Sequence, residues 1–241
     1  MMVTSSGPLV AVVGVGPGLG AALAARFGAG GCALAIASRS EASRAPVLQR
    51  LQSAGHPARG YDCDAGDPAS VAAAFASIRA QQGDPAVLLY NAGVFVVGGI
   101  LELSPATFES AWRTNCQGAF LASREVLPAM LAAGTGTVLF TGATAALRGG
   151  ARFAGLAVGK FGLRALSQSM AREFGPRGIH VGHVIVDGQI DSPRARAGDA
   201  QRAPDTLLAP AAIAENFWNL YQQPRSAWTQ ELDLRPFAER F

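Results

Sequence analysis

The sequence predicts an α/β fold in which a doubly wound parallel sheet of about seven strands carries helices on both faces. Three observations support this prediction. Short apolar runs rich in valine, leucine and isoleucine recur along the chain, and such runs are typical of parallel strands buried on both faces. Longer stretches with helical spacing separate them, so that strand and helix alternate. A glycine-rich turn joins the first strand directly to the first helix, which indicates a tight strand–turn–helix unit.

The expected elements follow in regular order, and no repeat or linker divides the chain, so we expect a single domain over residues 1–241. We expect strands over 9–13, 32–37, 58–61, 86–90, 136–141, 180–186 and 229–234. We expect helices over 21–27, 41–54, 67–82, 104–133, 156–174 and 210–221. Asp67 and Ser104 are each followed by proline, the pattern of an N-cap and a first helical position. Pro46 is expected to interrupt the second helix near its start.

Composition limits the classes of function that the chain can have. Of its 241 residues 49% are hydrophobic, and the 20 basic residues are scattered, with a formal net charge of +3; a nucleic-acid-binding protein would concentrate them. Cys32, Cys63 and Cys116 have no metal-ligand spacing, so we expect thiols in the reducing cytoplasm and no metal site. The N-terminal segment has no basic region, and the apolar run after it is too short to span a bilayer. We therefore expect a cytoplasmic protein that binds neither nucleic acid nor membrane.

The first turn is the strongest indication of a ligand. The run over 9–13 ends at Gly14, and the glycines that follow give the spacing G-x-x-x-G-x-G. The more common dinucleotide pattern G-x-G-x-x-G fails, because Leu19 stands where its third glycine would be. Free N–H groups at the start of the next helix form an anion site. We expect a dinucleotide pyrophosphate against Gly14, Gly18, Leu19 and Gly20. The alternative is a glycine-rich turn that binds nothing.

The end of the second strand indicates which dinucleotide is bound. In NAD-binding folds of this kind an acidic residue about 20 residues after the glycine turn holds the ribose 2′-hydroxyl. Here the strand ends in Ser38 and Arg39, and an arginine with neighbouring hydroxyls suits a 2′-phosphate. We therefore expect NADP(H) in preference to NAD(H). The alternative is that Arg39 only caps the strand end, and the nearby Glu41 weakens the distinction.

Lys160 is the only lysine in the chain, since all the other lysine-or-arginine positions hold arginine. Arginine serves well for surface charge, so a single retained lysine indicates a site that a planar guanidinium does not fit. We expect Lys160 to carry its compact ammonium into a binding site. The alternative is that its position is accidental.

Five motifs in order along the chain resemble those of the short-chain dehydrogenase/reductase family. The glycine spacing lies close to the N-terminus, and the fourth strand runs into Asn91-Ala92-Gly93, which is similar to the family's N-N-A-G turn. Tyr90 stands where the first asparagine of that turn is usual. The resemblance implies a Rossmann-type fold and an NAD(P) cofactor whose adenosine side is bordered by Asn91, Ala92 and Gly93.

The resemblance also assigns roles to three further residues. Asp64 matches an aspartate that contacts the adenine ring; the alternative is a solvated turn residue. Asn115 matches a mid-helix asparagine whose backbone carbonyl holds a water bonded to the catalytic lysine, and an asparagine inside an apolar helix is otherwise unfavourable. Lys160 stands at the position of that lysine, which in the family binds the ribose hydroxyls and lowers the pKa of a tyrosine.

Two catalytic positions of the family carry no hydroxyl here. The tyrosine of its Tyr-x-x-x-Lys motif would precede Lys160 by four residues, and Leu156 stands there. The family's serine would precede the lysine by 17 residues, and Ala143 stands there, with Thr141 and Thr144 nearby. None of the three tyrosines of the chain completes a Tyr-x-x-x-Lys motif. In these respects the chain resembles a divergent branch of the family.

The turn after the sixth strand resembles the family's Pro-Gly segment, which holds the nicotinamide carboxamide. Gly188 is retained, Ser192 stands at the threonine position, and Ile190 lies between them as a further expected cofactor contact. Asp187 replaces the proline. A carboxylate next to a nicotinamide is unusual, so Asp187 is either a solvated turn residue or a substitute acid/base group.

These residues favour transfer of hydride between NADP(H) and a small carbonyl or alcohol, with a proton relay that differs from the family's. Loss of a general acid typically costs about 10²–10⁴ in rate, but positioning of the reactants still lowers the barrier. The proton could be moved by Thr144, Asp187, Arg152 or a water held by Asn115 and Lys160. One alternative is a catalytically silent NADP(H)-binding sensor or assembly protein. Another is a lyase or isomerase that uses Asp187 as base.

The helix that contains Lys160 also bears on assembly. Gly155, Gly159 and Gly162 give it a smooth face, and each glycine costs roughly 1 kcal/mol relative to alanine. Close helix contact across a symmetry axis would offset that cost, so we expect a homodimer or homotetramer. The alternative is packing within the subunit. The loop over 192–209, which would cover the substrate, has no readable specificity.

Overall fold

The computed structural model describes residues 7–197 and 205–238. Within them, seven strands form one sheet in the order β3-β2-β1-β4-β5-β6-β7, and every neighbouring pair is parallel. The strands are β1 (Leu9–Val13), β2 (Ala33–Ser38), β3 (Ala58–Asp62), β4 (Val87–Tyr90), β5 (Gly136–Thr141), β6 (Ile179–Val186) and β7 (Glu231–Leu234). The strand order reverses between β1 and β4, so the predicted Rossmann-type doubly wound sheet is confirmed.

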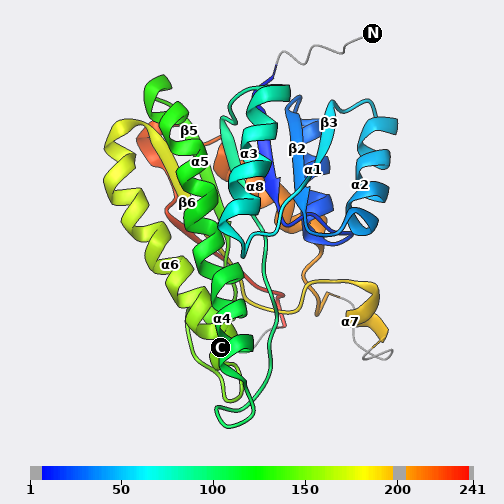
Figure 1. Cartoon of the computed structure of the whole chain (residues 1–241), viewed down its shortest axis with the longest axis vertical. Coiled ribbons are helices and arrows are strands. Elements are labelled where there is room, and N and C mark those ends of the chain that lie inside the picture. Colours follow the sequence, from blue (N-terminus) through cyan, green and yellow to red (C-terminus); the bar gives the residue numbers. More distant parts are fainter. Residues whose placement is uncertain (1–6, 198–204, 239–241) are drawn as a thin grey trace.

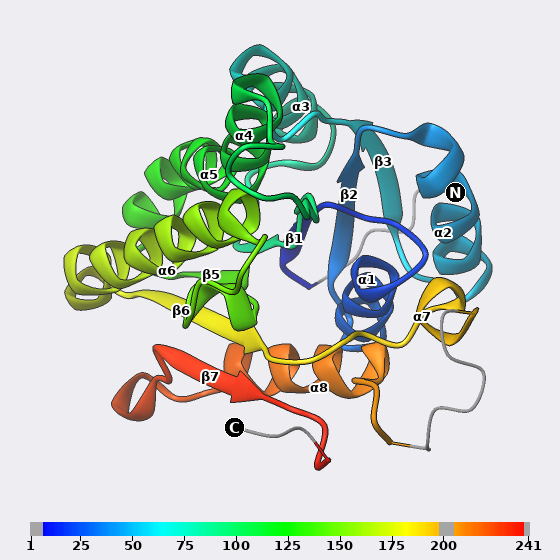
Figure 2. The same ribbon diagram turned by 90° about the horizontal axis from the view of Figure 1, so that it is seen from below.

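Helices cover both faces of this sheet (Figures 1 and 2). One face carries α1 (Leu19–Ala29), α2 (Glu41–Ser53) and α8 (Pro210–Tyr221). The other carries α3 (Pro68–Gln82), α4 (Pro105–Trp112), α5 (Gly118–Ala133) and α6 (Ala154–Phe174). A short helix, α7 (Pro193–Ala197), follows β6. In the described part of the chain, no helix combines the length and apolar character that a membrane crossing requires.

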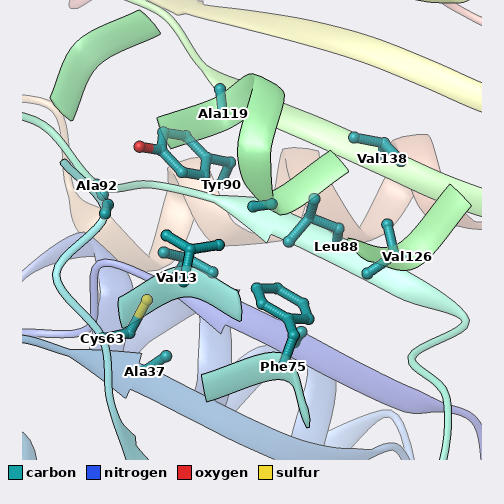
Figure 3. Packing of buried hydrophobic residues seen from close by; sticks show 14 of the residues in the cluster. Val13, Ala37, Cys63, Phe75, Leu88, Tyr90, Ala92, Ala119, Val126 and Val138 are labelled. Atoms are coloured by element: carbon teal, nitrogen blue, oxygen red, sulfur yellow. The ribbon is translucent and has the colours of Figure 1, made fainter. Parts of the chain in front are cut away.

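A large core cluster lies between the sheet and the helices α3 and α5 (Figure 3). Val13 of β1 and Leu88 of β4 pack there with Phe75 of α3 and Val126 of α5, and none is more than 1% exposed. Burying such a side chain contributes about 1.5–3 kcal/mol relative to leaving it in water. This packing fixes the carboxyl ends of β1 and β4, from which two walls of the candidate site emerge.

Two helix predictions are wrong. The helix expected over 104–133 is broken, because a π-helical turn, η1 (Arg113–Gln117), separates α4 from α5. Pro46 does not interrupt α2, which runs through it. A proline removes one intrahelical hydrogen bond, but Val47 and Leu51 on the following turn are buried against the sheet. The burial of these two side chains stabilises α2 as one continuous helix through the proline.

Candidate functional site

The glycine turn joins β1 directly to α1, as predicted, and its glycines differ in what surrounds them. Gly14 has a φ of +93°, and a Cβ on it would lie 2.3 Å from the backbone nitrogen of Ala92. A Cβ on Gly20 would lie 2.6 Å from the Gly14 carbonyl oxygen. These two glycines therefore let α1 pack against β1 and the turn after β4. Nothing lies within 4 Å of a Cβ on Gly18, so this residue leaves the start of α1 open.

A pocket of about 370 Å³ lies at this turn, where the strand order reverses. Gly18 is the N-cap of α1, and no side chain caps the helix, so its first N–H groups are available to an anion. The turns that follow β2, β3 and β4 supply the other walls. Among the predicted cofactor residues, the lining includes Gly14, Gly18, Leu19, Gly20, Ser38, Arg39, Asn91, Ala92 and Gly93.

Asn91 ties three strands together at the rim of the pocket. Its Nδ2 donates to the Gly14 carbonyl oxygen at 2.9 Å, and its Oδ1 accepts from the Thr141 hydroxyl at 3.1 Å. The side chain of Asn91 thus joins the ends of β1, β4 and β5. The structure gives this predicted cofactor neighbour a structural task as well as a place in the pocket wall.

The end of β2 presents Ser38 and Arg39 to the pocket, together with the first turn of α2. Arg39 is exposed and has no ion-pair partner in the described ranges. Ser40 caps α2 by accepting from the Ser43 N–H at 3.2 Å. The sequence did not point to Arg44, which is buried and donates to the Ser38 carbonyl oxygen at 2.8 Å. Arg44 therefore fixes the backbone on which Arg39 stands.

Asp64 forms its own turn. Its Oδ1 accepts from the Gly66 N–H at 2.9 Å, and its backbone N–H donates to the Ser70 hydroxyl at 2.9 Å. Its neighbours Cys63 and Ala65 line the pocket. The structure thus places Asp64 beside the site with one carboxylate oxygen engaged, and its contact with an adenine ring stays a prediction.

The π-helical turn is contacted by Tyr90, the last residue of β4, which stands where the family pattern usually has an asparagine. The Tyr90 hydroxyl donates to the Thr114 carbonyl oxygen at 2.6 Å. A π-helical turn widens the helix and leaves carbonyl groups without their usual partners, and the buried tyrosine satisfies one of them. A Cβ on Gly118 would lie 2.3 Å from the Tyr90 hydroxyl. Tyr90 and Gly118 therefore fit together as a pair.

Asn115 lies within this turn and is fully buried. Its Oδ1 accepts from the Val94 N–H at 3.1 Å and its Nδ2 donates to the Val94 carbonyl oxygen at 2.9 Å. The side chain therefore holds the segment after β4 in place. A Cβ on Gly93 would lie 3.1 Å from Asn115 Oδ1 and 3.7 Å from Lys160 Nζ. Asn115 and Lys160, predicted to act together, are thus brought to the same glycine of the pocket wall.

Lys160 is 6% exposed, on the face of α6 that is turned to the sheet. Its Nζ donates to the Thr141 carbonyl oxygen at 2.7 Å. No carboxylate pairs with it in the part of the chain that the structure describes. Burial disfavours the charged form and lowers the pKa of Lys160 to about 8. The charged ammonium next to the pocket therefore destabilises the folded protein.

Leu156 packs in a small apolar cluster with Ala145, Ala157 and Phe153, and it is 8% exposed. Ala143 precedes the short 3₁₀ turn η2 (Thr144–Ala146) at the end of β5. Leu156 and Ala143, the two residues predicted from the spacing to stand in place of the family's tyrosine and serine, thus have apolar side chains. Thr144 is the hydroxyl next to them in this turn.

Asp187 is buried, at 1% exposure, so the alternative of a solvated turn residue is wrong. The Thr144 hydroxyl donates to its Oδ1. Arg235, from the segment after β7, places a guanidinium nitrogen 3.2 Å from its Oδ2, and Arg148 lies 4.0 Å from its Oδ1. Local sequence could not show this arrangement, because Arg235 is far from Asp187 along the chain.

The predicted nicotinamide turn is packed against the C-terminal segment. Gly188 has a φ of +149°, and a Cβ on it would lie 2.7 Å from Pro236. Ile190 forms a parallel bridge with Leu208. The Ser192 hydroxyl accepts from the N–H of Ala195 at 3.1 Å, which fixes the start of α7. Residues 198–204 of the expected substrate loop lie outside the described residues.

Arg152, a further candidate for moving a proton, is engaged elsewhere. Its guanidinium makes two contacts of 2.6 Å with the carboxylate of Glu102, and its φ is +69°. The pair joins the loop before α6 to the loop before α4. A doubly paired, exposed guanidinium is a poor proton donor, so Arg152 is a structural link between the two loops.

The glycine face of α6 packs within the subunit. A Cβ on Gly159 would lie 2.6 Å from Asn115 Cβ, and one on Gly162 would lie 2.7 Å from Cys116 Sγ. These glycines let α6 approach the π-helical turn closely. The structure thus gives them a use that does not require a partner subunit.

Comparison with known proteins identifies the class. The family model "short chain dehydrogenase" matches residues 8–202. The chain belongs to the short-chain dehydrogenase family.

Individual relatives agree with this assignment. The chain is 30% identical over 206 residues to the 3-oxoacyl-[acyl-carrier-protein] reductase FabG of Escherichia coli, covering 85% of this chain and 83% of the relative. A short-chain dehydrogenase structure from Rhodopseudomonas palustris is 39% identical with a TM-score of 0.82, covering 95% and 98% of the two chains. A metagenomic short-chain oxidoreductase in complex with NADP is 25% identical with a TM-score of 0.82, covering 98% and 100%. The predicted family is confirmed, and it is a family of NAD(P)-dependent oxidoreductases.

Proposed function

We propose that the chain is an NADP(H)-dependent oxidoreductase that interconverts a small carbonyl compound and its alcohol. The observation that carries this proposal is the place of Lys160, a buried ammonium beside Gly93 at the wall of the pocket. A buried charge without a counter-ion is costly. A ligand with hydroxyl groups against this ammonium would offset the cost and explain why lysine is retained here.

The residues present fit a pyridine dinucleotide. Gly18 leaves an open cradle at the uncapped start of α1, which suits a pyrophosphate. Arg39 and Ser38 line the same pocket and suit a 2′-phosphate. Lys160 would hold a ribose hydroxyl with the donor that faces the pocket, and the turn over 188–192 would hold the carboxamide. When bound, such a cofactor supplies or accepts the hydride. The similar structure with NADP supports the choice of cofactor.

The proposed handling of the proton departs from the family's tyrosine and serine, and places the chain in a divergent branch. Thr144 gives its hydrogen to Asp187, so its oxygen is free to accept one from a substrate hydroxyl. In reduction the proton for the substrate oxygen comes from the Lys160 ammonium through a water in the pocket, and in oxidation the neutral amine takes it back by the same path. A pKa of about 8 suits both directions near neutral pH. Because Asp187 has partners on both oxygens, we propose that it orients Thr144.

Binding of the two dinucleotides tests the cofactor assignment. We expect NADPH to bind more tightly than NADH, and Arg39→Ala to weaken NADPH binding by about tenfold or more, since a charge-assisted hydrogen bond is lost. NADH binding should change little. Arg50→Ala, which changes an exposed arginine on α2 outside the pocket lining, is the matched control. Calorimetry that detects neither dinucleotide at millimolar concentration would refute the proposal.

A second candidate is a catalytically silent NADP(H)-binding sensor or assembly protein. The apolar surroundings of Leu156 favour it, because no hydroxyl stands where the family's acid does. Turnover separates the two. A protein that binds NADPH tightly, yet oxidises none of it across a broad panel of aldehydes and ketones, would be the silent form.

We further propose that the protein is a homodimer or homotetramer of the cytoplasm. Large apolar side chains are exposed on the outer faces of α4, α5 and α6, among them Trp112, Phe120 and Phe161. The π-helical turn joins α4 and α5 end to end, and α6 packs against α4 and this turn (Figure 1), so a second copy could cover the three helices together. The three cysteines are free thiols, which suits a reducing compartment. Light scattering on the purified protein would give the mass of the assembly.

A further inference from the structure

A row of polar groups lies under α6, behind Lys160 and outside the pocket; Lys160 and His183 are buried, and Arg164 and Glu231 are partly buried. His183 of β6 is 0% exposed. Lys160 and Arg164 stand one helical turn apart on α6, which packs on β6, and residues four apart share a helix face. Glu231 of β7 pairs with His183 in register. None of these groups except Lys160 has a part in the function proposed above.

Glu231 fixes the hydrogen of the histidine ring. Arg164 holds it with two contacts, Nε at 2.7 Å and Nη2 at 2.6 Å, and this guanidinium lowers the pKa of Glu231. Glu231 is therefore a carboxylate, which only accepts hydrogen bonds. His183 Nδ1 lies 3.1 Å from it, so Nδ1 carries the hydrogen and Nε2 is left as a bare lone pair.

The bare nitrogen is buried near the lysine. His183 Nε2 has no hydrogen-bond partner in the described ranges. It faces Gly142, where a Cβ would lie 2.5 Å from it, while Lys160 Nζ donates to the carbonyl oxygen of the preceding residue, Thr141. Acceptor and ammonium thus lie against the same short segment of backbone. A buried acceptor that no protein group reaches is typically met by an ordered water.

We propose that His183 is a positioning residue for Lys160, and that its Nε2 accepts a hydrogen bond from the ammonium through one bridging water. One donor of the ammonium then goes to Thr141, one to the water, and the third faces the pocket. The ring stays neutral, because burial lowers the pKa of His183 to about 4 and the charges of Lys160 and Arg164 also oppose its protonation. Glu231 is the only carboxylate facing the ring among the groups that act on its titration. The inference rests on the role proposed for Lys160.

The single lysine of the chain makes a direct test possible. Lysine labelled with ¹⁵N and ¹³C gives one side-chain signal, whose titration reports Lys160 alone. We expect a midpoint near pH 8 in the unaltered protein. His183→Leu should lower it by about 1 pH unit, because the charged form loses an acceptor. His183→Gln, whose amide oxygen can reach the place of Nε2, should restore most of the shift.

His180→Leu is the matched control, since His180 is a buried histidine of the same strand that bonds instead to the Thr229 carbonyl oxygen. It should leave the midpoint unchanged. A midpoint that does not fall in His183→Leu overturns the proposal. If that variant does not fold, the ¹⁵N spectrum of the unaltered protein decides, because hydrogen on Nε2 of His183 overturns it equally. The titration needs neither cofactor nor substrate, so its outcome is independent of turnover. A catalytically silent protein would still give the expected shifts, and an active enzyme without them would refute only the role of His183.

Discussion

At the scale of single residues, Lys160 indicates a binding site because its buried charge destabilises the folded protein. The folded-state pKa of about 8 lies below the ordinary value of 10.5. Between those values the unfolded chain holds a proton that the folded chain has released, so the fold gains stability as the pH rises through the interval. Below pH 8 the buried charge is a burden of about 3 kcal/mol. Methionine at this position would avoid it, which indicates that the charge has a use.

The pH dependence of cofactor binding follows from the same residue. We expect NADPH affinity to fall as the pH rises from about 6.5 to about 9.5, since the neutral amine loses its charge-assisted contacts with the ribose. Lys160→Met should bind more weakly at low pH and should lose the pH dependence. Fluorescence titration of both proteins across this range checks the prediction. If the NADPH affinity of Lys160→Met still falls as the pH rises, another titrating group is responsible.

Some residue roles could be predicted from the sequence, and others could not. Gly14, Gly18 and Lys160 could be placed because each has a chemical property that few positions require. Tyr90 and His183 gave no signal of their own, because their roles depend on groups supplied by other elements: the carbonyl of Thr114, and the carboxylate of Glu231. Such partners are known only when the fold is known.

At the scale of elements, the strands could be predicted because buried parallel strands are continuous apolar runs. The π-helical turn could not, because the sequence around it has ordinary helical spacing. It forms where the Tyr90 hydroxyl reaches the Thr114 carbonyl oxygen and Asn115 turns inward to Val94. The turn and the glycines of α6 are then complementary, since Gly159 lies directly against Asn115.

That complementarity predicts unequal effects of alanine along one helix. Gly159→Ala would place a Cβ 2.6 Å from Asn115 Cβ, so we expect a loss of about 1–3 kcal/mol of unfolding free energy and weaker NADPH binding as Lys160 shifts. Gly155→Ala meets only ordinary contacts at 3.5 Å and should be neutral or stabilising, by up to about 1 kcal/mol. Urea denaturation of both variants measures the difference. Equal losses would mean that the helix contact is not the cause.

At the scale of the whole molecule, the C-terminal segment of the chain closes over the turn after β6. The family resemblance predicts a nicotinamide-binding turn after β6, but it offers no partner for the carboxylate that stands in place of the proline there. In the fold, Arg235 reaches Asp187 from beyond β7, and Pro236 covers Gly188. The fold class follows from local patterns, whereas this closure depends on two segments that meet only when β7 joins the sheet edge.

The closure can be measured as a coupling energy. Arg235→Gln leaves the buried Asp187 carboxylate short of a counter-charge and should cost about 2–4 kcal/mol of unfolding free energy. Asp187→Asn leaves Arg235 without this contact and should also destabilise. If the two side chains act on each other, the double variant should lose less than the two single losses added together, by about 1 kcal/mol or more. Thermal or urea unfolding of the four proteins gives the cycle. Strict additivity would mean that the C-terminal segment is held by its apolar contacts alone, and that Asp187 is retained for Thr144.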